Sequence, residues 1–410
     1  MKKNIYLSII IAVIACLYSF NSSALTWTQR ANVGSIPRAY ACGFSISTTG
    51  YIGTGQDSSG YSRADFWAWD QLTNTWTQKA DLTGGARAYA CGFSIGQKGY
   101  IMCGLKLLGD TTDVWEYTPA TNAWVAKAAY PGAGRENIIG LSIGTKGYVG
   151  TGGSIINPPA NDWWEFNPTA NTWTAKASMP GQSRVGAAGF IIASNCYVGT
   201  GMHNLTYLND FYEFNTLSNT WTIKTAFGGS ARYLAVGFNI GNLGYFATGD
   251  DGSTKSDCWE YSIGSNSWTQ IASLSIGRAS AVGFGIGTKG YIGTGFNTPP
   301  QTLLKDFWEL GSPAGIDNVP VKDESINVFP NPFTEYISIS YSLEKSSPVK
   351  IELFDLTGKS VCVLSDEANQ NPGEYSSKWN LGESNLSNGM YILTINAGEN
   401  VYTRRVNLVK

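Results

Sequence analysis

Six arginines recur at one position of a repeat and are the most prominent candidates for chemistry in this chain. They stand 46 to 49 residues apart, as Arg38, Arg87, Arg135, Arg184, Arg232 and Arg278. A ring of guanidinium groups is suited to binding carboxylates or sugar hydroxyls. The alternative is structural, with each arginine tying its own repeat together through an aspartate or loop carbonyls. Sixfold repetition favours the structural interpretation, because a specific ligand rarely needs six identical contacts.

Other candidates stand where the copies differ. Glu136 follows Arg135 where the other copies have Ala, Val or Tyr, so it is a candidate general acid or base. A solvated loop residue is the alternative. Tyr61, His203 and Tyr207 lie in variable loops and are candidate ligand contacts, because variable loops on a rigid scaffold are where recognition residues concentrate.

The sequence offers few residues suited to binding a metal ion or a cofactor. Asp250 and Asp251 with Ser253 could hold Ca²⁺, but their spacing does not match the EF-hand pattern. One His in 410 residues excludes any mechanism that needs two imidazoles. No Walker loop, HExxH or suitably placed GxSxG motif occurs. We therefore expect no metal and no cofactor.

Composition excludes further classes of protein. The 28 Lys+Arg against 30 Asp+Glu leave a net charge of -2, which is not the electrostatic footprint of a nucleic-acid binder. A hydrophobic fraction of 43% is too high for a disordered chain. Six cysteines follow residue 24. We expect free core thiols, because Cys42 and Cys91 share a repeat position that holds Ile, Ala or Val elsewhere, although a disulfide framework stays open.

The N-terminus has the pattern of a secretory signal peptide. Lys2 and Lys3 precede an apolar stretch at 5–20, and small residues follow up to Ala24. We place the signal peptide at residues 1–24. The rival interpretation is a lipoprotein box in which Cys16 carries a lipid anchor. Either way the protein leaves the cytoplasm, and no transmembrane span is expected in the mature chain.

Further markers recur with the arginines and define the elements that must position them. Each copy has a Gly five residues after its Arg, a Gly-Tyr run that mostly ends in Gly-Thr-Gly, an Asp before alternating aromatics, and an Asn-x-Trp turn. The tryptophans are Trp27, Trp76, Trp124, Trp173, Trp221 and Trp268. Four short β-type runs per copy of nearly 50 residues predict an all-β fold, a six-bladed β-propeller at 25–310. We expect residues 25–30 to complete the sixth blade, small residues to lie near the axis, and the Arg and Asp to share the top face.

These motifs resemble the kelch repeat, also seen in galactose-oxidase-like propellers. The resemblance covers about 285 residues. Kelch repeats usually end the second strand with a double glycine, whereas most copies here have Gly-Thr-Gly. Galactose-oxidase-like copper chemistry implies two His ligands, and this chain has one His.

A second domain follows a linker at 311–325. Alternating apolar runs at 326–410 predict a small, Ig-like antiparallel β-sandwich. Phe329-Pro330-Asn331-Pro332, the DLTGK run at 355–359, Gly389-Met390-Tyr391 and the terminal Lys410 resemble the type A C-terminal sorting domain of type IX (Por) secretion. The resemblance implies a bacterium of the Bacteroidota type, passage through the outer membrane, the secretion machinery as partner, and removal of the domain.

Two functions remain in play. The first is a secreted or cell-surface binding protein, not an enzyme, that recognises an extracellular glycan or protein through its top-face loops. The second is a carbohydrate-acid isomerase or epimerase, like some six-bladed kelch proteins of the sialic-acid-mutarotase type, that uses an Arg and Glu136.

Overall fold

The structure, a computed structural model, describes residues 25–154, 156–312, 326–343, 346–355, 360–381, 386–397 and 400–409. The expected signal peptide at 1–24 with Cys16, most of the expected linker and Lys410 lie outside the described residues. The chain divides into two compact units, Met1–Pro313 and Ala314–Lys410, and each is described by itself.

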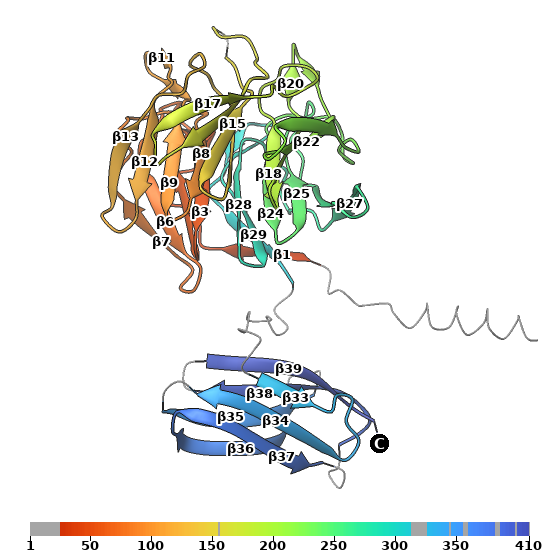
Figure 1. Ribbon diagram of the computed structural model, residues 1–410. Coiled ribbons are helices and arrows are strands. Elements are labelled where there is room, and N and C mark those ends of the chain that lie inside the picture. Colours follow the sequence, from red (N-terminus) through yellow and green to blue (C-terminus); the bar gives the residue numbers. More distant parts are fainter. Residues whose placement is uncertain are drawn as a thin grey trace, which may run out of the picture. The chain divides into compact units, whose positions relative to one another are not determined.

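The described part of the first unit contains six four-stranded antiparallel sheets, one for each copy of the repeat, which we call blades 1 to 6 (Figure 1). Blade 1 consists of β3 (Cys42–Ile46), β4 (Thr49–Gly53), β6 (Phe66–Asp70) and β7 (Thr75–Lys79). Blade 2 consists of β8 (Cys91–Ile95), β9 (Lys98–Met102), β12 (Val114–Thr118) and β13 (Ala123–Lys127). Blade 3 consists of β14 (Ile139–Ile143), β15 (Lys146–Gly150), β16 (Trp163–Asn167) and β17 (Thr172–Lys176).

Blades 4 to 6 continue the same order. Blade 4 consists of β18 (Ala188–Ile192), β19 (Asn195–Gly199), β22 (Phe211–Asn215) and β23 (Thr220–Ile223). Blade 5 consists of β24 (Val236–Ile240), β25 (Leu243–Ala247), β26 (Cys258–Ser262) and β27 (Ser267–Ile271). Blade 6 consists of β28 (Val282–Ile286), β29 (Lys289–Gly293), β32 (Phe307–Gly311) and β1 (Thr26–Arg30). β32 thus ends one residue beyond the expected end of the propeller.

The N-terminal strand closes the ring of blades. β1 pairs antiparallel with β32, so that Trp27 lies opposite Leu310. Arg30 forms an ion pair with Glu309 at 2.6 Å. Lys127 and Glu116 form the matching cross-strand pair inside blade 2, at 3.2 Å. Residues from opposite ends of the repeat region therefore reproduce the pairing found within an uninterrupted blade.

Burial is greatest in the second strand of a blade and least in the outer strand. The inner strands contact their neighbours in a closed circle, in the order β3, β8, β14, β18, β24, β28 and back to β3. The repeated Gly allows this contact: a Cβ on Gly237 would lie 2.2 Å from the carbonyl oxygen of Gly189 in the next inner strand. The second strands are buried on both faces, whereas the outer strands are mostly exposed. Each inter-blade layer is filled by aromatic and aliphatic side chains, which is the stacking that buries both faces of each sheet.

The Asn-x-Trp turns clamp neighbouring blades together. In blade 1, the backbone N–H of Ala31 donates to Asn74 Oδ1 at 3.0 Å, and the indole N–H of Trp76 donates to the carbonyl of the same Ala31 at 2.8 Å. Blades 2 to 5 repeat both bonds. In blade 6, Trp27 bonds to Ala272, but Leu25 stands where the other copies have Asn. Each Asn has a positive φ, as its turn requires (Asn74, Asn122, Asn171, Asn219 and Asn266).

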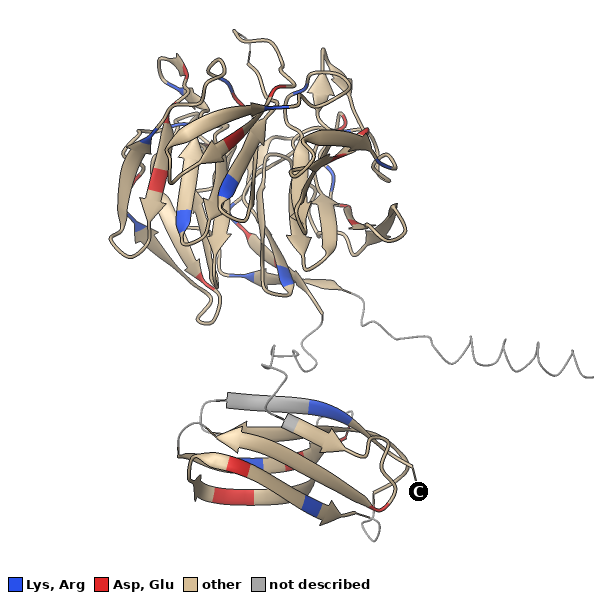
Figure 2. Ribbon diagram, viewed as in Figure 1, with Lys and Arg blue, Asp and Glu red and all other residues tan. Residues whose placement is uncertain are grey.

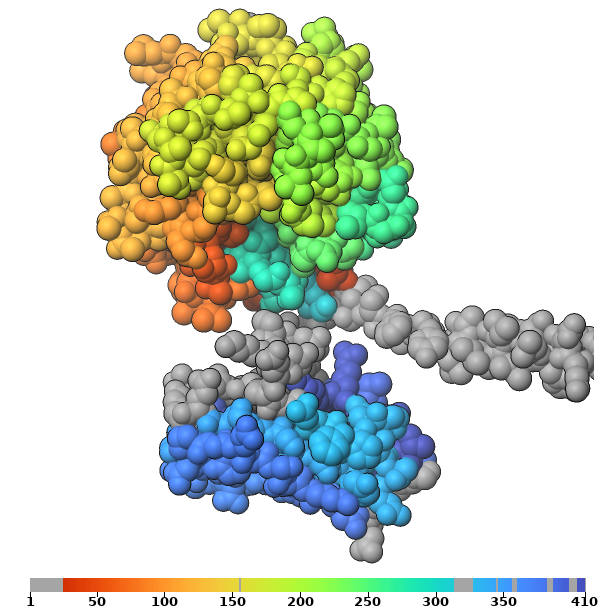
Figure 3. Space-filling model, viewed as in Figure 1, coloured from red at the N-terminus to blue at the C-terminus, as the bar shows by residue number. Residues whose placement is uncertain are grey.

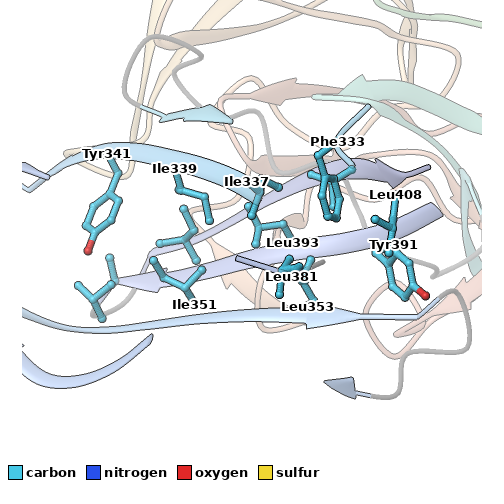
Figure 4. Close-up of a cluster of buried hydrophobic side chains, with 14 residues drawn as sticks. Phe333, Ile337, Ile339, Tyr341, Ile351, Leu353, Leu381, Tyr391, Leu393 and Leu408 are labelled. Carbon is cyan, nitrogen blue, oxygen red and sulfur yellow. The ribbon is translucent and has the colours of Figure 1, made fainter. Parts of the chain in front are cut away.

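The second unit is a β-sandwich. One sheet contains β33 (Ile326–Phe329), β34 (Tyr336–Leu343) and β37 (Gly373–Asn380). The other contains β36 (Ser360–Gln370), β35 (Ser347–Phe354), β38 (Gly389–Ala397) and β39 (Asn400–Leu408). Side chains from both sheets, among them Ile339, Ile351 and Leu393, meet in one core (Figure 4). The immunoglobulin-like topology stays a prediction.

Two features bear on function. Five of the described cysteines are buried and Cys362 is half-buried, and all six are free. In the part of the chain that the structure describes, no helix has the length and apolar character to cross a bilayer.

Candidate functional site

The six repeated arginines lie inside the blades, each paired with an aspartate. In blade 1, Arg38 donates from Nη1 and Nη2 to the two carboxylate oxygens of Asp65, at 2.7 and 2.6 Å, and from Nη1 to the Thr54 carbonyl at 3.0 Å. The arginines are 0 to 5% exposed. The pairs are Arg38–Asp65, Arg87–Asp113, Arg135–Asp162, Arg184–Asp210, Arg232–Asp257 and Arg278–Asp306.

In blade 1, the contacts of Arg38 hold Asp65 as an anion. Burial, the largest single influence, raises the pKa of Asp65, but the hydrogen bonds and charge of Arg38 together lower it below its usual value. The indole N–H of Trp67 donates to the same carboxylate at 2.7 Å, and four other blades repeat this bond. An incoming carboxylate would have to displace Asp65 from a buried pair, which leaves an uncompensated charge. This geometry favours the structural interpretation of the arginines.

The Gly-Thr-Gly departure from the kelch pattern belongs to the same network. Thr54 has φ 60°, which turns its carbonyl toward Arg38. Gly55 has φ 89° and donates its N–H to the Arg87 carbonyl of the next blade at 2.8 Å. A Cβ on Gly55 would lie 2.7 Å from the Ala39 carbonyl, so only Gly fits.

Two residues beyond each arginine, the chain forms a second ring around the axis. All six residues at this position have φ between 51° and 62°. Each donates its N–H to the carbonyl of its counterpart in the preceding blade, at 2.9 to 3.2 Å. We call this the axial belt; its members are Tyr40, Tyr89, Asn137, Gly186, Leu234 and Ser280. Its backbone is the same in every blade, whereas its side chains differ.

The belt surrounds a cavity of about 120 Å³ at the mouth of the axial channel. Aromatic rings gather there: Tyr40 lies 4.1 Å from Tyr89 and 5.6 Å from Phe296 between ring centroids. Ser280 also lines the cavity, and its hydroxyl is buried without a hydrogen-bond partner. Below the belt, a second cavity of about 180 Å³ is lined by the small residues of the inner strands, as the sequence predicts.

Glu136 directly precedes the belt residue Asn137 and lies against the loop of blade 2. Burial raises its pKa to about 7, with further contributions from the charge and hydrogen bonding of Asp110. Asp110 itself accepts hydrogen bonds from Ser154 and Asn157, which belong to the loop of blade 3. The Glu136 side chain thus contacts the loop of blade 2, while the guanidinium of Arg135 is turned into the blade toward Asp162.

A lateral groove adjoins the mouth. It has a volume of about 420 Å³ and lies between the top loops of blades 1 and 6. Tyr40 lines both the groove and the axial cavity. The other groove residues include Pro37, Gln56, Asp57, Gln301 and Leu303. A two-stranded sheet and a hairpin supply its lining: β2 (Arg38–Ala39) pairs with β5 (Gln56–Asp57), and β30 (Phe296–Asn297) forms a hairpin with β31 (Thr302–Leu303).

The remaining sequence candidates lie on two loops of the top face: Tyr61 in blade 1, and His203 and Tyr207 together on the paired strands β20 (Met202–His203) and β21 (Thr206–Tyr207) of blade 4. Tyr61 is 71% exposed, close in sequence to the groove residue Gly60. His203 Nδ1 is 2.7 Å from the Ser183 carbonyl oxygen, and Nε2 is 3.0 Å from the side-chain nitrogen of Asn204, so both ring nitrogens are engaged. Tyr207 contacts Tyr233 at 5.6 Å between ring centroids.

The weak calcium candidate is occupied by protein groups. Asp250 accepts the backbone N–H of Gly252 at 2.7 Å, and Asp251 pairs with Lys255 at 2.9 Å. Within the described ranges, no cluster of three His, Cys, Asp or Glu side chains is arranged to hold a metal ion.

Sequence reasoning missed the axial belt, which includes Tyr40, Tyr89 and Ser280. It also missed the aromatic neighbours Phe296 and Tyr233. A signal for the belt was present, because the position two residues after each Arg holds Tyr, Tyr, Asn, Gly, Leu and Ser. The variation could have been found by aligning the six copies. Its placement around one cavity follows only from the closed ring of blades.

Comparisons with known proteins bear on each unit. A family model described as a secretion system C-terminal sorting domain matches residues 327–409. No curated protein matches the chain. A solved structure titled "Structure of YjhT" is 18% identical with a TM-score of 0.59, and the match covers 67% of this chain and 95% of that chain. At this identity the likeness is evidence for the fold alone.

The sorting domain indicates export, to the medium or to the cell surface, and implies an interaction with the type IX secretion machinery. The chain is an exported β-propeller protein that carries a type IX secretion C-terminal sorting domain.

Proposed function

We propose that the propeller is an extracellular binding module of the kelch type that recognises a glycan or a protein through its top face. The observation that carries this proposal is the contrast on that face: the six arginines are buried in ion pairs, while aromatic side chains line an open mouth and groove. Residues 1–24 would direct the chain across the inner membrane, and the sorting domain would direct it across the outer one.

The groove has the dimensions and lining of a binding site, and the smaller mouth adjoins it. Ligand sites are concave, partly aromatic and supplied with a few polar groups that fix orientation. The groove offers the amides of Gln56 and Gln301 beside Tyr40, and its volume falls in the usual range for ligand pockets. Tyr40 joins the two cavities, so one extended ligand can occupy both.

A protein partner is supported by the loops of blades 2, 3 and 4. Their tips carry apolar side chains that are 77 to 99% exposed: Leu107, Leu108, Ile156 and Leu205. These loops project from the body of the propeller (Figure 3). Exposed apolar groups that cluster on one face are typical of interaction surfaces.

A glycan array and a protein-binding screen with the purified secreted protein test this proposal. We expect binding that is lost when the hairpin at 296–303 is exchanged or when Tyr40→Ala is introduced. Leu72→Ala, in an exposed turn elsewhere on the same unit, is the matched control and keeps full binding. Loss on exchanging 105–110 or 202–207 instead, with Tyr40→Ala unaffected, assigns the ligand to the apolar loop tips. Binding that survives every top-face exchange contradicts the proposal.

The second candidate, a carbohydrate isomerase or epimerase, is supported by Glu136. A carboxyl group whose pKa is raised to about 7 can give and take a proton near neutral pH. A carbohydrate acid also needs a cation, and the arginines are buried in ion pairs with aspartates, which weakens this candidate. Turnover of sialic-acid-type substrates that is abolished in Glu136→Gln would support it. Binding without turnover by the same protein supports the binding module.

A further inference from the structure

Three carboxylates of the top-face loops have no cationic partner among the described residues. They are Asp110, Glu136 and Asp250, and the ion pairs found on the described top face involve other acids. Lys106 pairs with Asp113, Lys255 with Asp251, and Arg63 with Asp57. Figure 2 shows charged residues scattered thinly over the propeller in that view, with no broad basic patch. These three carboxylates are therefore not neutralised by an ion pair on the described top face.

Two of these carboxylates, Asp250 and Glu136, interact with nearby tyrosines. Asp250 pairs through its backbone with Tyr233, and its charge contributes to the raised pKa values of Tyr40 and Tyr233, after their burial. Glu136 acts on Tyr89 in the same way, after burial and the charge of Tyr40. Tyr233 also acts on Tyr89, although blades 2 and 5 lie on opposite sides of the ring. Glu136 and Asp250 thus act on Tyr89 and Tyr40, the two tyrosines that line the axial cavity.

An unsatisfied polar group lies inside that opening. Ser280 is 8% exposed, lines the axial cavity, and has a hydroxyl with no hydrogen-bond partner among the described residues. A buried hydroxyl without a partner costs free energy unless a ligand or water supplies one. The hydroxyl can accept a hydrogen bond from a donor that enters the cavity between Tyr40 and Tyr89.

We propose that the axial mouth binds an ammonium group, carried by an amino sugar or by a lysine side chain. Aromatic faces attract a cation through their quadrupole, carboxylates attract it through charge, and the Ser280 oxygen accepts one of its protons. The same acids repel a carboxylate ligand. This inference rests on the proposed binding function and names its ligand chemistry.

Matched ligands in which the nitrogen is either a basic amine or a neutral acetamide test it. The probes are a β-1,4-linked glucosamine tetramer and its fully N-acetylated counterpart, and a lysine-containing peptide and its Nε-acetylated counterpart, titrated by calorimetry into the purified secreted protein. A tetramer of galacturonate serves as the anionic probe. We expect at least one cationic probe to bind about tenfold or more tightly than its acetylated counterpart, and the anionic probe not to bind.

Variants assign that difference to the mouth. Asp250→Asn is expected to weaken the cationic probe by about five- to tenfold while leaving the acetylated one unchanged. Glu136→Gln is expected to weaken it less, because a pKa of about 7 leaves Glu136 only partly ionised near neutral pH. Asp81→Asn, at an exposed position on the loop that follows β7, is the control with unchanged binding. Ser280→Ala is expected to weaken the cationic probe by about threefold.

The outcomes separate this inference from the proposed function. The ammonium site is overturned if the protein prefers an acetylated or anionic probe. It is also overturned if Glu136→Gln and Asp250→Asn bind the cationic probe as tightly as the parent does. Either result leaves a binding module in place. Absence of binding to both cationic probes also overturns the ammonium site, and absence of any top-face ligand on the arrays as well overturns the proposed function. Binding of the peptide but not of the amino sugar supports the site and identifies a protein as the ligand.

Discussion

Arg87 and Tyr89 are two residues apart, yet they belong to regions with opposite properties. The repeat position of Arg87 holds Arg in all six copies, and Arg87 itself is fully buried and pairs with Asp113. The repeat position of Tyr89 varies among the copies, and the Tyr89 ring lies half-buried at the open axial mouth. Between them the chain turns into the left-handed region at Tyr89 and bonds to the neighbouring blade.

The difference shows why some residues repeat in every blade of such a ring while others vary. A contact that every blade needs, such as Arg with Asp and Asn with the next blade, repeats with the fold. The axial belt uses only backbone groups for its inter-blade bonds, so its side chains are free to differ. Chemistry that serves a single ligand therefore accumulates at the variable position beside the repeated one.

The largest expected effect comes from removing a repeated arginine. Arg87→Ala leaves Asp113 as an incompletely paired, partly buried carboxylate and removes the bonds to the Cys103 and Gly84 carbonyls. We expect a loss of about 3–5 kcal/mol in the free energy of unfolding, measured by urea denaturation. Lys106→Ala removes the more exposed partner of the same Asp113 and should cost under about 1 kcal/mol. Equal losses in the two variants would contradict the structural role of the arginine.

An intermediate effect is expected at the clamp between blades. Asn219→Ala removes the acceptor for the Ala177 N–H and places a less tolerant residue at φ 57°. We expect a loss of about 1–2 kcal/mol in unfolding free energy. Leu217→Ala, in the same turn but 89% exposed, should change stability by less than about 0.5 kcal/mol. If the two variants are equally stable, the repeated Asn serves no clamp.

A smaller, pH-dependent effect is expected at Glu136. Its folded pKa of about 7 exceeds its ordinary value of 4.5, so the folded protein holds the proton more tightly and stability falls as pH rises from about 4.5 to 7. Asp110 and Tyr89 are the titratable groups that act on it. Glu136→Gln should remove this loss and be about 1 kcal/mol more stable than the parent at pH 8, after allowance for solvent screening, and no more stable at pH 4. A pH-independent difference between the two proteins would refute the assignment.

Much of the architecture could be predicted from the sequence, because the markers of each blade are short-range and repeat six times. The spacing of Trp27 from the later tryptophans is enough to assign β1 to the last blade. The pairing of each Arg with the strand-three Asp was one of two interpretations, and distances were needed to favour it. The site was less accessible, since Tyr40, Phe296 and Ser280 come from blades 1 and 6, at opposite ends of the repeat region. Only ring closure brings them together.

The double variant Tyr40→Ser/Tyr89→Ser tests the central contrast most directly, because Ser already occupies this belt position in blade 6. Titration of this variant with the ligand that binds the parent protein is the measurement. We predict that binding is lost while the free energy of unfolding changes by no more than about 2 kcal/mol, since the belt bonds are made by the backbone. Unchanged affinity in the folded double variant would contradict the account.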